Sequence, residues 1–237
     1  MKSVSVVDLG ITQYKSTWDL QHQLFDLRVA GSIGDVLLLN EHHHVYTLGK
    51  SSDDDHLLAS ETELQKSGAE VFHIDRGGDI TYHGPGQLVC YPILDLNQYY
   101  ADVHRYLRDL EEVVIRTLAE YDIHAHRDGQ FTGVWVENEK IAAVGVKTSH
   151  WVTMHGFAFN VNTDLSYFEK IIPCGIFHKG VTSVQQLLNQ TLPMNAVSEK
   201  IIRHFGEVFG CTMIQTDRDE LLQSLQMKTT EITECLQ

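Results

Sequence analysis

Long apolar runs are absent from this sequence, and none approaches the roughly 20 residues that are needed to cross a bilayer. The first ten residues include one lysine but neither an extended apolar core nor a small-residue cleavage site, so they predict a strand rather than a signal peptide. Proline is also scarce, with 4 among 237 residues, which argues against a largely disordered chain. We therefore expect a soluble, cytoplasmic protein that does not use a membrane.

Basic residues are scarce as well. The chain has 18 lysines and arginines against 32 aspartates and glutamates, a formal net charge of -14. Nucleic-acid binding requires a basic surface that neutralises phosphates, so we expect no nucleic-acid partner. An acidic protein partner would instead need a local basic patch on this chain. The candidates for that patch are Arg76, Arg127, Lys147 and Lys179.

Closely spaced cysteine pairs are missing. The four cysteines stand far apart and none forms a C-x-x-C pair; they are Cys90, Cys174, Cys211 and Cys235. An even number allows two disulfides, but without a secretion signal we expect reduced thiols. A lone cysteine is more often a small buried hydrophobe than a nucleophile. Cys174 has better catalytic prospects than the others, because Pro173 and Gly175 beside it predict a tight, exposed turn.

What the sequence does contain is the composition of a folded domain, with 43% hydrophobic and 21% charged residues. Its length corresponds to one large α/β domain or at most two small ones. The clearest helix is predicted over 103–121, where apolar residues recur at three- and four-residue steps. Further helices are predicted over 56–67, from 164 towards 172, and after Ser183.

Strands are predicted from short apolar or alternating runs over 4–9, 36–39, 45–48, 132–137, 140–147, 152–162 and 212–215. Helices and strands mix without strict alternation, which predicts the α/β (α+β) class with a mixed sheet flanked by helices. No internal repeat is visible, so we predict a single domain over 1–237. Within it, residues from about 190 to 237 are expected to form a small C-terminal extension of helix and strand.

The most unusual segment runs from Arg76 to Gln87 and reads R-G-G-D-I-T-Y-H-G-P-G-Q. Its four glycines and one proline predict a loop whose backbone approaches a ligand closely. A pair of structural turns is the simpler interpretation, but it requires none of Arg76, Tyr82 and His83. The spacing matches neither a P-loop nor a Rossmann fingerprint, which excludes those two kinds of phosphate site.

Two later segments carry small residues at alternating positions. They read K-I-A-A-V-G-V-K over 140–147 and H-G-F-A-F-N over 155–160, and the small residues are Ala143, Gly145, Gly156 and Ala158. Such residues would leave an apolar slot between neighbouring strands that is long enough for an acyl chain. The alternative is tight strand packing without a cavity, and the sequence alone favours it.

The chain resembles the lipoyl(octanoyl) transferases through four motifs in this order: R-G-G-D-I-T-Y-H-G-P-G-Q, K-I-A-A-V-G-V, H-G-F-A-F-N-V-N and P-C-G-I. The resemblance covers roughly residues 35–190. It implies the fold of biotin and lipoate protein ligases, and a catalytic dyad of Cys174, the acyl-thioester carrier, and Lys140. The substrate-binding residues that it implies are Arg76, Gly77, Gly78, Asp79, Ile80, Thr81, Tyr82, His83, Ala143, Val144, Gly145, Gly156, Phe157 and Ala158.

The activity that this resemblance implies is octanoyl transfer from octanoyl-acyl carrier protein to a lysine of apo lipoyl domains, through a cysteine thioester. The donor is carried on the phosphopantetheine of the carrier protein, so we expect no other cofactor, no metal and no ATP. The implied acceptors are the lipoyl domains of 2-oxoacid dehydrogenase E2 subunits and the glycine cleavage H protein.

Three other functions stay open. An ATP-dependent lipoate-protein ligase shares the fold but needs no cysteine. A cysteine-dependent octanoyl amidotransferase would take its acyl group from a protein lysine. A non-catalytic module that binds the acyl carrier would contain Cys174 only as a packed residue. A cysteine hydrolase is disfavoured, because no Cys/His pair with a hydrolase-like context is present.

Two assignments depend on which way strand residues point. Lys147 competes with Lys140 for the dyad, but their odd spacing of seven places them on opposite faces of a regular strand, so we assign Lys140. Among the histidines, His83 is assigned to the substrate wall and His155 to a supporting position.

The sequence departs from the family pattern at residues 42–44, where three histidines stand in a place that usually holds proline. Adjacent strand residues point to opposite faces, so these side chains cannot easily converge on one metal ion. We expect them to form a polar surface or an edge of the site.

Overall fold

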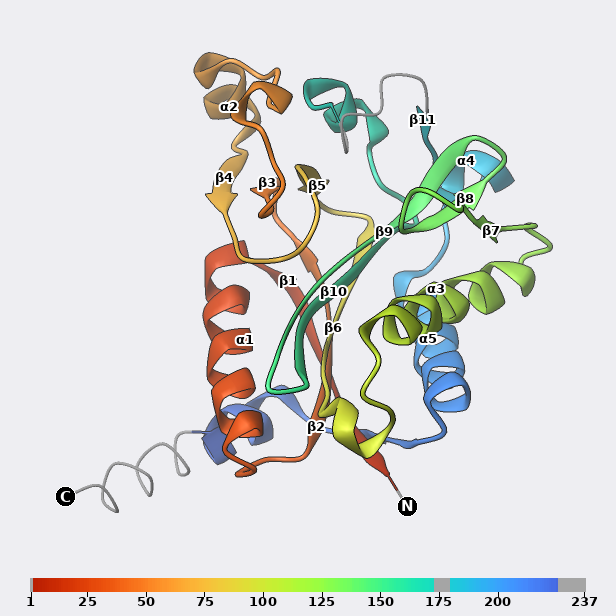
Figure 1. Ribbon diagram of the computed structural model, residues 1–237. Helices are drawn as coiled ribbons and strands as arrows, with labels where there is room; N and C mark the ends of the chain where they lie inside the picture. The colour runs from red at the N-terminus through yellow and green to blue at the C-terminus, as the bar shows by residue number, and fades with distance from the viewer. Residues whose placement is uncertain (1, 173–179, 226–237) are drawn as a thin grey trace.

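The computed structural model describes residues 2–172 and 180–225, and its main feature is a large mixed sheet (Figure 1). The strand order is β12 (Thr212–Gln215), β1 (Ser3–Thr12), β2 (Asp35–His42), β6 (Gln87–Ile93), β10 (Val152–Asn160), β9 (Glu139–Ser149), β8 (Val134–Val136) and β7 (His126–Arg127), and β11 (Gly180–Val181) pairs with β9. The pairs β12–β1, β1–β2 and β11–β9 are parallel, and the others are antiparallel. The predicted fold class, a mixed sheet flanked by helices, is confirmed.

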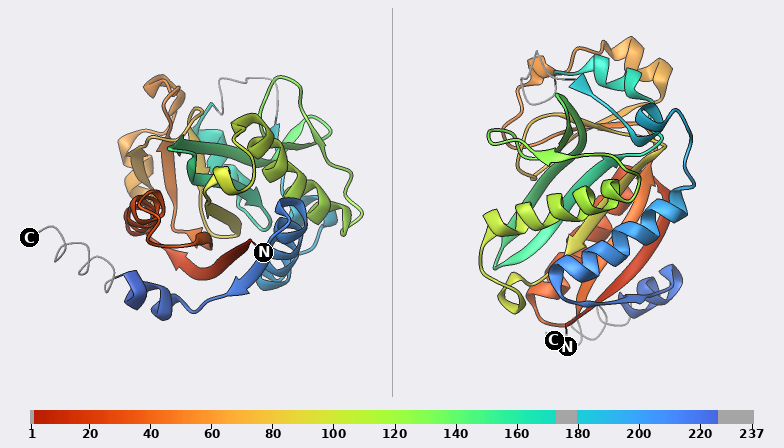
Figure 2. Two further views of the ribbon diagram at one scale, coloured as in Figure 1. Left: turned by 60° about the horizontal axis from the view of Figure 1, so that its bottom comes forward. Right: turned by 90° about the vertical axis from the view of Figure 1, so that its right-hand side faces the viewer.

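Helices cover both faces of this sheet. α1 (Tyr14–Val29) lies on one face, and α3 (Val103–Ala119) and α5 (Met194–Phe209) lie side by side on the other (Figures 1 and 2). The helix predicted over 103–121 is confirmed as α3, which buries its apolar stripe against the sheet. In the described part of the chain, no helix has the length and apolar character needed to cross a membrane.

Among the described residues beyond 190, α5 and β12 are built into this core. α5 presents one apolar side chain per turn, at Val197, Ile201, Phe205 and Phe209, to the cluster that it shares with α3. β12 then adds a strand beside β1, in register from Ser3 opposite Thr212. Before α5, the helix predicted after Ser183 is present as α4 (Val184–Leu188), and the Ser183 hydroxyl accepts a hydrogen bond from the Gln186 N–H.

A smaller sheet contains β4 (Glu70–His73), β3 (Val45–Leu48) and β5 (Thr81–His83). It shares an apolar cluster with α2 (Glu61–Ser67) and with the 3-10 helix η3 (Leu165–Lys170), which occupies the segment predicted as a helix after Asp164.

The helix predicted over 56–67 is wrong at its start. Asp54–His56 form only a 3-10 turn, η1, and α2 begins after Ser60. The helix starts later because Ser60 and Glu63 form a capping box, in which each residue's side chain accepts a hydrogen bond from the other's backbone N–H. The extended residues before Ser60 carry Leu57, which pairs instead with Ile171.

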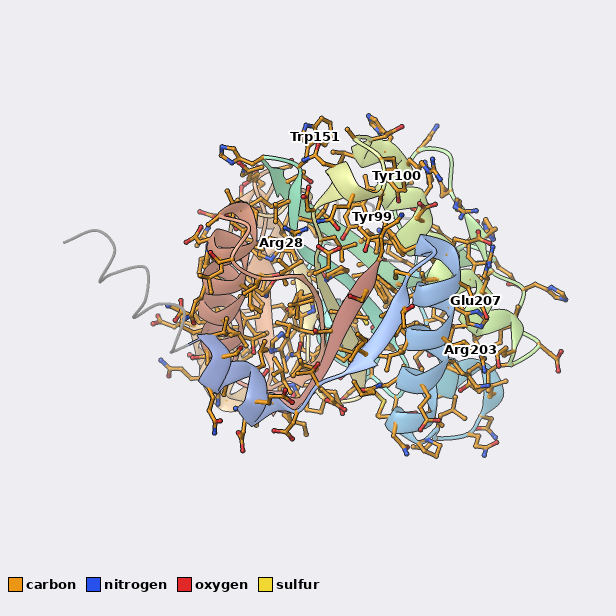
Figure 3. The ribbon with its side chains drawn as sticks, turned by 90° about the horizontal axis from the view of Figure 1, so that it is seen from below. Arg28, Tyr99, Tyr100, Trp151, Arg203 and Glu207 are labelled. Carbon is orange, nitrogen blue, oxygen red and sulfur yellow. The ribbon has the colours of Figure 1, made fainter. Side chains whose placement is uncertain are left out.

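At the lower end of the molecule in Figure 1, a buried carboxylate ties α1 to the sheet. Arg28 Nε donates to Asp35 Oδ1 and the Tyr99 hydroxyl donates to Asp35 Oδ2, each at 2.8 Å. Figure 3 shows Arg28 and Tyr99 at this end. Because the buried charges are paired and hydrogen-bonded, this end is well fixed. The opposite end contains the candidate site.

Candidate active site

A cavity of about 460 Å³ lies between the loop that precedes β5 and strands β6, β9 and β10. Tyr14 at the start of α1 and residues 130–132 add further parts of its lining, and most of its wall is apolar. Its volume falls in the range of roughly 300–1,000 Å³ that is usual for small-molecule sites. The cavity is therefore large enough to hold a medium-length acyl chain.

The structure brings the predicted site residues together around this cavity, although they come from separate segments of the chain. Those that line it are Arg76, Gly77, Gly78, Asp79, Ile80, Thr81, His83, Lys140, Ala143, Val144, Gly145, Gly156, Phe157 and Ala158. Cys174 lies outside the described residues. Phe168 and Val181, which precede and follow it in the described chain, both line the cavity.

Tyr82 differs from the other predicted wall residues that the structure describes, because its side chain does not line the cavity. Thr81 and His83 face the cavity, so the side chain between them on β5 points to the opposite side. The Tyr82 ring is fully buried and stacks on Tyr167, and its hydroxyl lies 2.8 Å from His44 Nδ1. Tyr82 therefore supports the smaller sheet rather than the cavity wall.

The small residues of β9 and β10 allow close backbone approach. A Cβ at Gly145 would lie 2.9 Å from the carbonyl oxygen of Gly77, and one at Gly156 would lie 2.1 Å from that of Cys90. The Gly77 N–H donates to Val146 O at 2.9 Å, which fastens the loop to β9. Tight packing, the alternative to a slot, thus explains these two glycines, and the cavity lies beside them.

Replacing Gly156 with alanine is expected to lower the free energy of unfolding by about 1–3 kcal/mol, the usual cost of overpacking. The added methyl would collide with the Cys90 carbonyl and force β6 and β10 apart. Urea unfolding measures the change. Gly34→Ala is the matched control, because nothing lies within 4 Å of a Cβ at that position. Equal stability of the two variants would show that the strands separate easily.

Arg76 and Asp79 hold the loop in place. Arg76 Nη2 donates to the carbonyl and to the hydroxyl of Thr47, at 2.7 and 3.1 Å, which ties the loop to β3. Asp79 Oδ2 accepts from His56 Nδ1 at 2.6 Å, which ties it to η1. Both residues also line the cavity, so the same contacts that fix the loop fix that wall.

Lys140 lines the cavity from the start of β9 and is 9% exposed. Its Nζ lies 4.8 Å from the centroid of the Trp135 ring, within the range of a cation–π interaction. Its aliphatic chain passes Gly133, where a Cβ would lie 3.3 Å from Lys140 Cε. The Gly133 N–H donates at 2.9 Å to Glu111, which is fully buried. Trp135 and Gly133 together confine the lysine, and Glu111 fixes the position of Gly133.

Lys147, the competing lysine, is bound elsewhere. Its Nζ donates to Asp75 Oδ2 at 2.6 Å, and Asp75 Oδ1 accepts from His155 Nε2 at 2.8 Å. The hydrogen bond from His155, and to a smaller extent the one from Lys147, holds the pKa of Asp75 well below its usual range. Both lysines lie in the described part of the chain, and of the two only Lys140 lines the cavity. This placement favours Lys140 for the dyad.

The histidines at 42–44 have three different environments. His42 is fully buried, with Nε2 2.7 Å from the Tyr91 hydroxyl, whereas His43 is exposed and His44 stacks on Tyr167. The expected polar surface is therefore wrong for His42. Its neighbour Tyr91 lines the cavity, so His42 supports the cavity wall from behind.

Acid is expected to destabilise the fold through its buried histidines. Burial lowers the pKa of His42 to about 4 and that of His83 to about 3, from an ordinary value of 6.5. Below pH 6.5 these two histidines are protonated in the unfolded chain but remain neutral in the folded chain. The stability is thus complete above that pH and is lost as the pH falls toward the folded pKa values. Between about pH 7 and about pH 5 the loss is about 2 kcal/mol per histidine.

Urea unfolding at the two pH values tests this expectation. His42→Gln should remove about half of the loss that the two histidines cause, whereas the exposed His43→Gln should leave it unchanged. A free energy of unfolding that is the same at both pH values would contradict the account.

The predicted basic patch is wrong for its three described members. Arg76 is buried beneath the loop, Lys147 is paired with Asp75, and Arg127 is paired with Glu111 and Glu112. Lys179 lies outside the described residues. Since Lys147 and Arg127 are already paired with carboxylates and Arg76 is buried, these three residues offer little attraction to an acidic partner.

Several cavity residues escaped the sequence prediction. They are Tyr14, Gln87, Val89, Tyr91, Val103, Leu107, Gln130, Phe131, Thr132, Val146, Asn160, Phe168 and Val181. His155, which the sequence assigns to a supporting position, also lines the cavity. One group had a usable pattern, because Gln87, the last residue of the glycine-rich segment, alternates with Val89 and Tyr91 along β6. Tyr14 had none, since the packing of α1 brings it to the cavity.

Comparison with known proteins supports the motifs. A family model described as the lipoyl protein ligase A/B catalytic domain matches residues 13–206. An octanoyltransferase from Flavobacterium psychrophilum is 50% identical over 230 residues, which cover 90% of this chain and 99% of that protein. An octanoyltransferase from Rubrobacter xylanophilus is 53% identical over 203 residues, which cover 85% of this chain and 91% of that protein.

Solved structures share the fold at low sequence identity. A bi-partite lipoate protein ligase from Thermoplasma acidophilum has a TM-score of 0.74 at 16% identity, covering 96% of this chain and 92% of that one. Biotin protein ligase from Aquifex aeolicus has a TM-score of 0.51 at 13% identity, covering 89% and 70%. The predicted biotin/lipoate protein ligase fold is confirmed. With the three motifs that the structure describes gathered at one cavity and octanoyltransferase relatives matched over most of their length, the chain belongs to the lipoyl protein ligase A/B catalytic domain family.

Proposed function

We propose that the chain takes an octanoyl group from octanoyl-acyl carrier protein, holds it as a thioester on Cys174 and passes it to a lysine of apo lipoyl domains. The reaction takes place in the cytoplasm and uses no ATP, metal or other cofactor. The activity itself, octanoyl transfer in protein lipoylation, follows from family membership and from relatives named octanoyltransferase at 49–53% identity. The donor, the intermediate and the individual acceptors are the proposal.

The observation that carries the proposal is the position of Lys140 beside the apolar cavity. Its side chain is 9% exposed and is confined by Trp135 and Gly133. In β11, Val181 pairs with Lys140, and the Thr182 N–H donates to Lys140 O at 3.0 Å. Val181, the partner of Lys140, follows Cys174 by only seven positions in the sequence. This supports the pairing of Cys174 with Lys140.

The first half-reaction exchanges one thioester for another. The Cys174 thiolate attacks the octanoyl carbonyl, and the bond from that carbon to the phosphopantetheine sulfur breaks. The Lys140 ammonium favours the thiolate, whose parent thiol ordinarily has a pKa of about 8.5. The ammonium then gives its proton to the departing phosphopantetheine sulfur, which leaves as a thiol. Because the acyl group stays activated throughout, no ATP is consumed.

The second half-reaction forms an amide. The amine of the acceptor lysine attacks the acyl-enzyme, the bond to Cys174 Sγ breaks and the sulfur leaves as a thiolate. The amine loses one proton, which neutral Lys140 accepts, so the starting ion pair is restored. An amide is more stable than a thioester, which makes this step favourable.

The oxyanion in both steps needs hydrogen-bond donors. Gly77 is a poor candidate, because its N–H already donates to Val146 O at 2.9 Å. The N–H groups of Gly78 and Cys174 are the remaining candidates in the two motifs.

The acceptors that we propose are the lipoyl domains of 2-oxoacid dehydrogenase E2 subunits and the glycine cleavage H protein. A comparison of donors tests the function with a purified apo lipoyl domain. Octanoyl-acyl carrier protein without ATP should yield octanoylated acceptor, detected by intact mass. Octanoate with ATP should yield none, and neither should an octanoylated protein lysine. Transfer only from octanoate with ATP would instead identify a ligase, and transfer from a protein lysine an amidotransferase.

A further inference from the structure

Three buried polar side chains form a continuous line beneath the cavity. His83 Nδ1 lies 2.7 Å from Gln87 Oε1, Gln87 Nε2 lies 2.9 Å from Asn160 Oδ1, and Asn160 Nδ2 lies 3.1 Å from Thr182 O. The three side chains are 6%, 2% and 4% exposed and all line the cavity. They come from β5, β6 and β10, so the line crosses from the smaller sheet to the larger one.

The direction of each hydrogen bond follows from the acceptor at the far end. The Thr182 carbonyl can only accept, so Asn160 donates through Nδ2 and its Oδ1 faces Gln87. Gln87 must then donate through Nε2, which also reaches the carbonyl of Tyr82 at 3.2 Å. Its Oε1 therefore faces His83 and can only accept. The hydrogen-bond network thus assigns the proton of the neutral His83 ring to Nδ1.

The same direction of hydrogen-bond donation continues on the other side of His83, from Arg76 through Thr47 to the His83 ring. Arg76 Nη2 donates to Thr47 Oγ1 at 3.1 Å, so the Thr47 hydroxyl is left to donate to His83 Nε2, 3.4 Å away. Each group in the series donates to the next one further from the guanidinium, and hydrogen bonds aligned in this way polarise and strengthen one another. At the far end, the Thr182 N–H donates to Lys140 O at 3.0 Å.

Burial, together with the neighbouring His42 and Arg76, lowers the pKa of His83 to about 3. The other titratable groups that face its ring are Tyr14 and His155. His83 is thus neutral near pH 7 and a weak base, and its Nε2 lone pair accepts from the Thr47 hydroxyl. This excludes a general-base role for His83 in the attack by the acceptor amine.

We propose that Gln87 and Asn160 are positioning residues: Gln87 holds His83 as the Nδ1–H tautomer, and Asn160 links it to Thr182 and so to the backbone of Lys140. The first part is independent of the proposed function, and the second rests on Lys140 as the dyad lysine. Two isosteric variants separate the parts. Asn160→Asp still accepts from Gln87 but has no N–H for Thr182. Gln87→Glu still accepts from His83 but has no N–H for Asn160, and it adds a charge beside the ring.

The first measurement is the nitrogen NMR spectrum of labelled histidine in the full chain. In the wild type, the His83 ring should be protonated at Nδ1 alone from about pH 5.5 to about pH 8. Asn160→Asp should keep this pattern. In Gln87→Glu the ring should become protonated at both nitrogens within that range, because an opposite charge favours the imidazolium. Gln98→Glu, the same change at an exposed position, should behave as wild type. A wild-type ring that carries its proton on Nε2 would overturn the proposal.

The second measurement is single-turnover acylation by octanoyl-acyl carrier protein. Asn160→Asp and Gln87→Glu should slow it about 10- to 100-fold, with little change in the half-saturating donor concentration, because misplacement of a reacting group lowers the rate of the chemical step. A folded Asn160→Asp variant with the wild-type rate would overturn the link to Lys140. If the wild type itself forms no acyl-enzyme, the proposed function fails, while the NMR result still decides the His83 tautomer.

Discussion

Lys140→Ala is expected to slow octanoyl transfer by roughly 10²–10⁴-fold, the usual contribution of a general acid–base group. The variant loses the ammonium that favours the Cys174 thiolate and protonates the departing sulfur. It also loses the amine that accepts the proton of the acceptor lysine. Lys147, the other lysine of β9, is paired with Asp75 and so is not placed to replace Lys140. The rate of formation of octanoylated lipoyl domain, followed by intact mass, measures the effect.

Lys147→Ala is the matched control for this prediction. Lys147 stands on the same strand but donates to Asp75, so its removal should change the rate by only a few-fold. The opposite result, with Lys147→Ala inactive and Lys140→Ala active, would identify Lys147 as the dyad lysine. It would also show that lining the cavity does not identify the catalytic lysine.

Cys174→Ala should abolish octanoyl transfer, a loss of roughly 10³-fold or more, because without the thiol the reaction has no covalent intermediate. Steady-state transfer from octanoyl-acyl carrier protein measures the loss, and thermal unfolding checks that the variant is folded. A non-catalytic carrier-binding module predicts instead that only carrier binding is measurable, and that Cys174→Ala leaves it unchanged.

Cys211→Ala controls for the general effect of removing a thiol. Partial burial raises the pKa of Cys211 to about 11, so it is largely protonated near neutral pH and a poor nucleophile. The variant should keep the wild-type rate. Loss of transfer in Cys211→Ala, with Cys174→Ala active, would refute the assignment of the nucleophile.

Much of the fold is predictable because local patterns agree with tertiary packing. α3 carries apolar residues at helical spacing, and its face meets the sheet, so the pattern and the core coincide. β3 and β12 occur at the predicted residues, 45–48 and 212–215. The start of α2 is different, since the helix is predicted to begin at residue 56 but the capping box at Ser60 sets its actual start.

The site is predictable where a motif names residues and is less so where a side chain's direction matters. Tyr82 stands in the glycine-rich motif, yet strand alternation turns it away from the cavity. Gln87 and Asn160 also stand in quoted motifs, but their role depends on a contact between residues 73 positions apart. His42 becomes buried because α1 places Tyr14 over it. No local pattern carries such information, because it arises when separate segments meet.

Intact-protein mass spectrometry after mixing the chain with octanoyl-acyl carrier protein, without ATP or acceptor, tests the central claim most directly. The account predicts one octanoyl group on the wild type, released by hydroxylamine as a thioester should be, and none on Cys174→Ala. An octanoyl group that resists hydroxylamine, or that persists on Cys174→Ala, would contradict it, as would the absence of any adduct on a folded wild-type chain that binds the carrier.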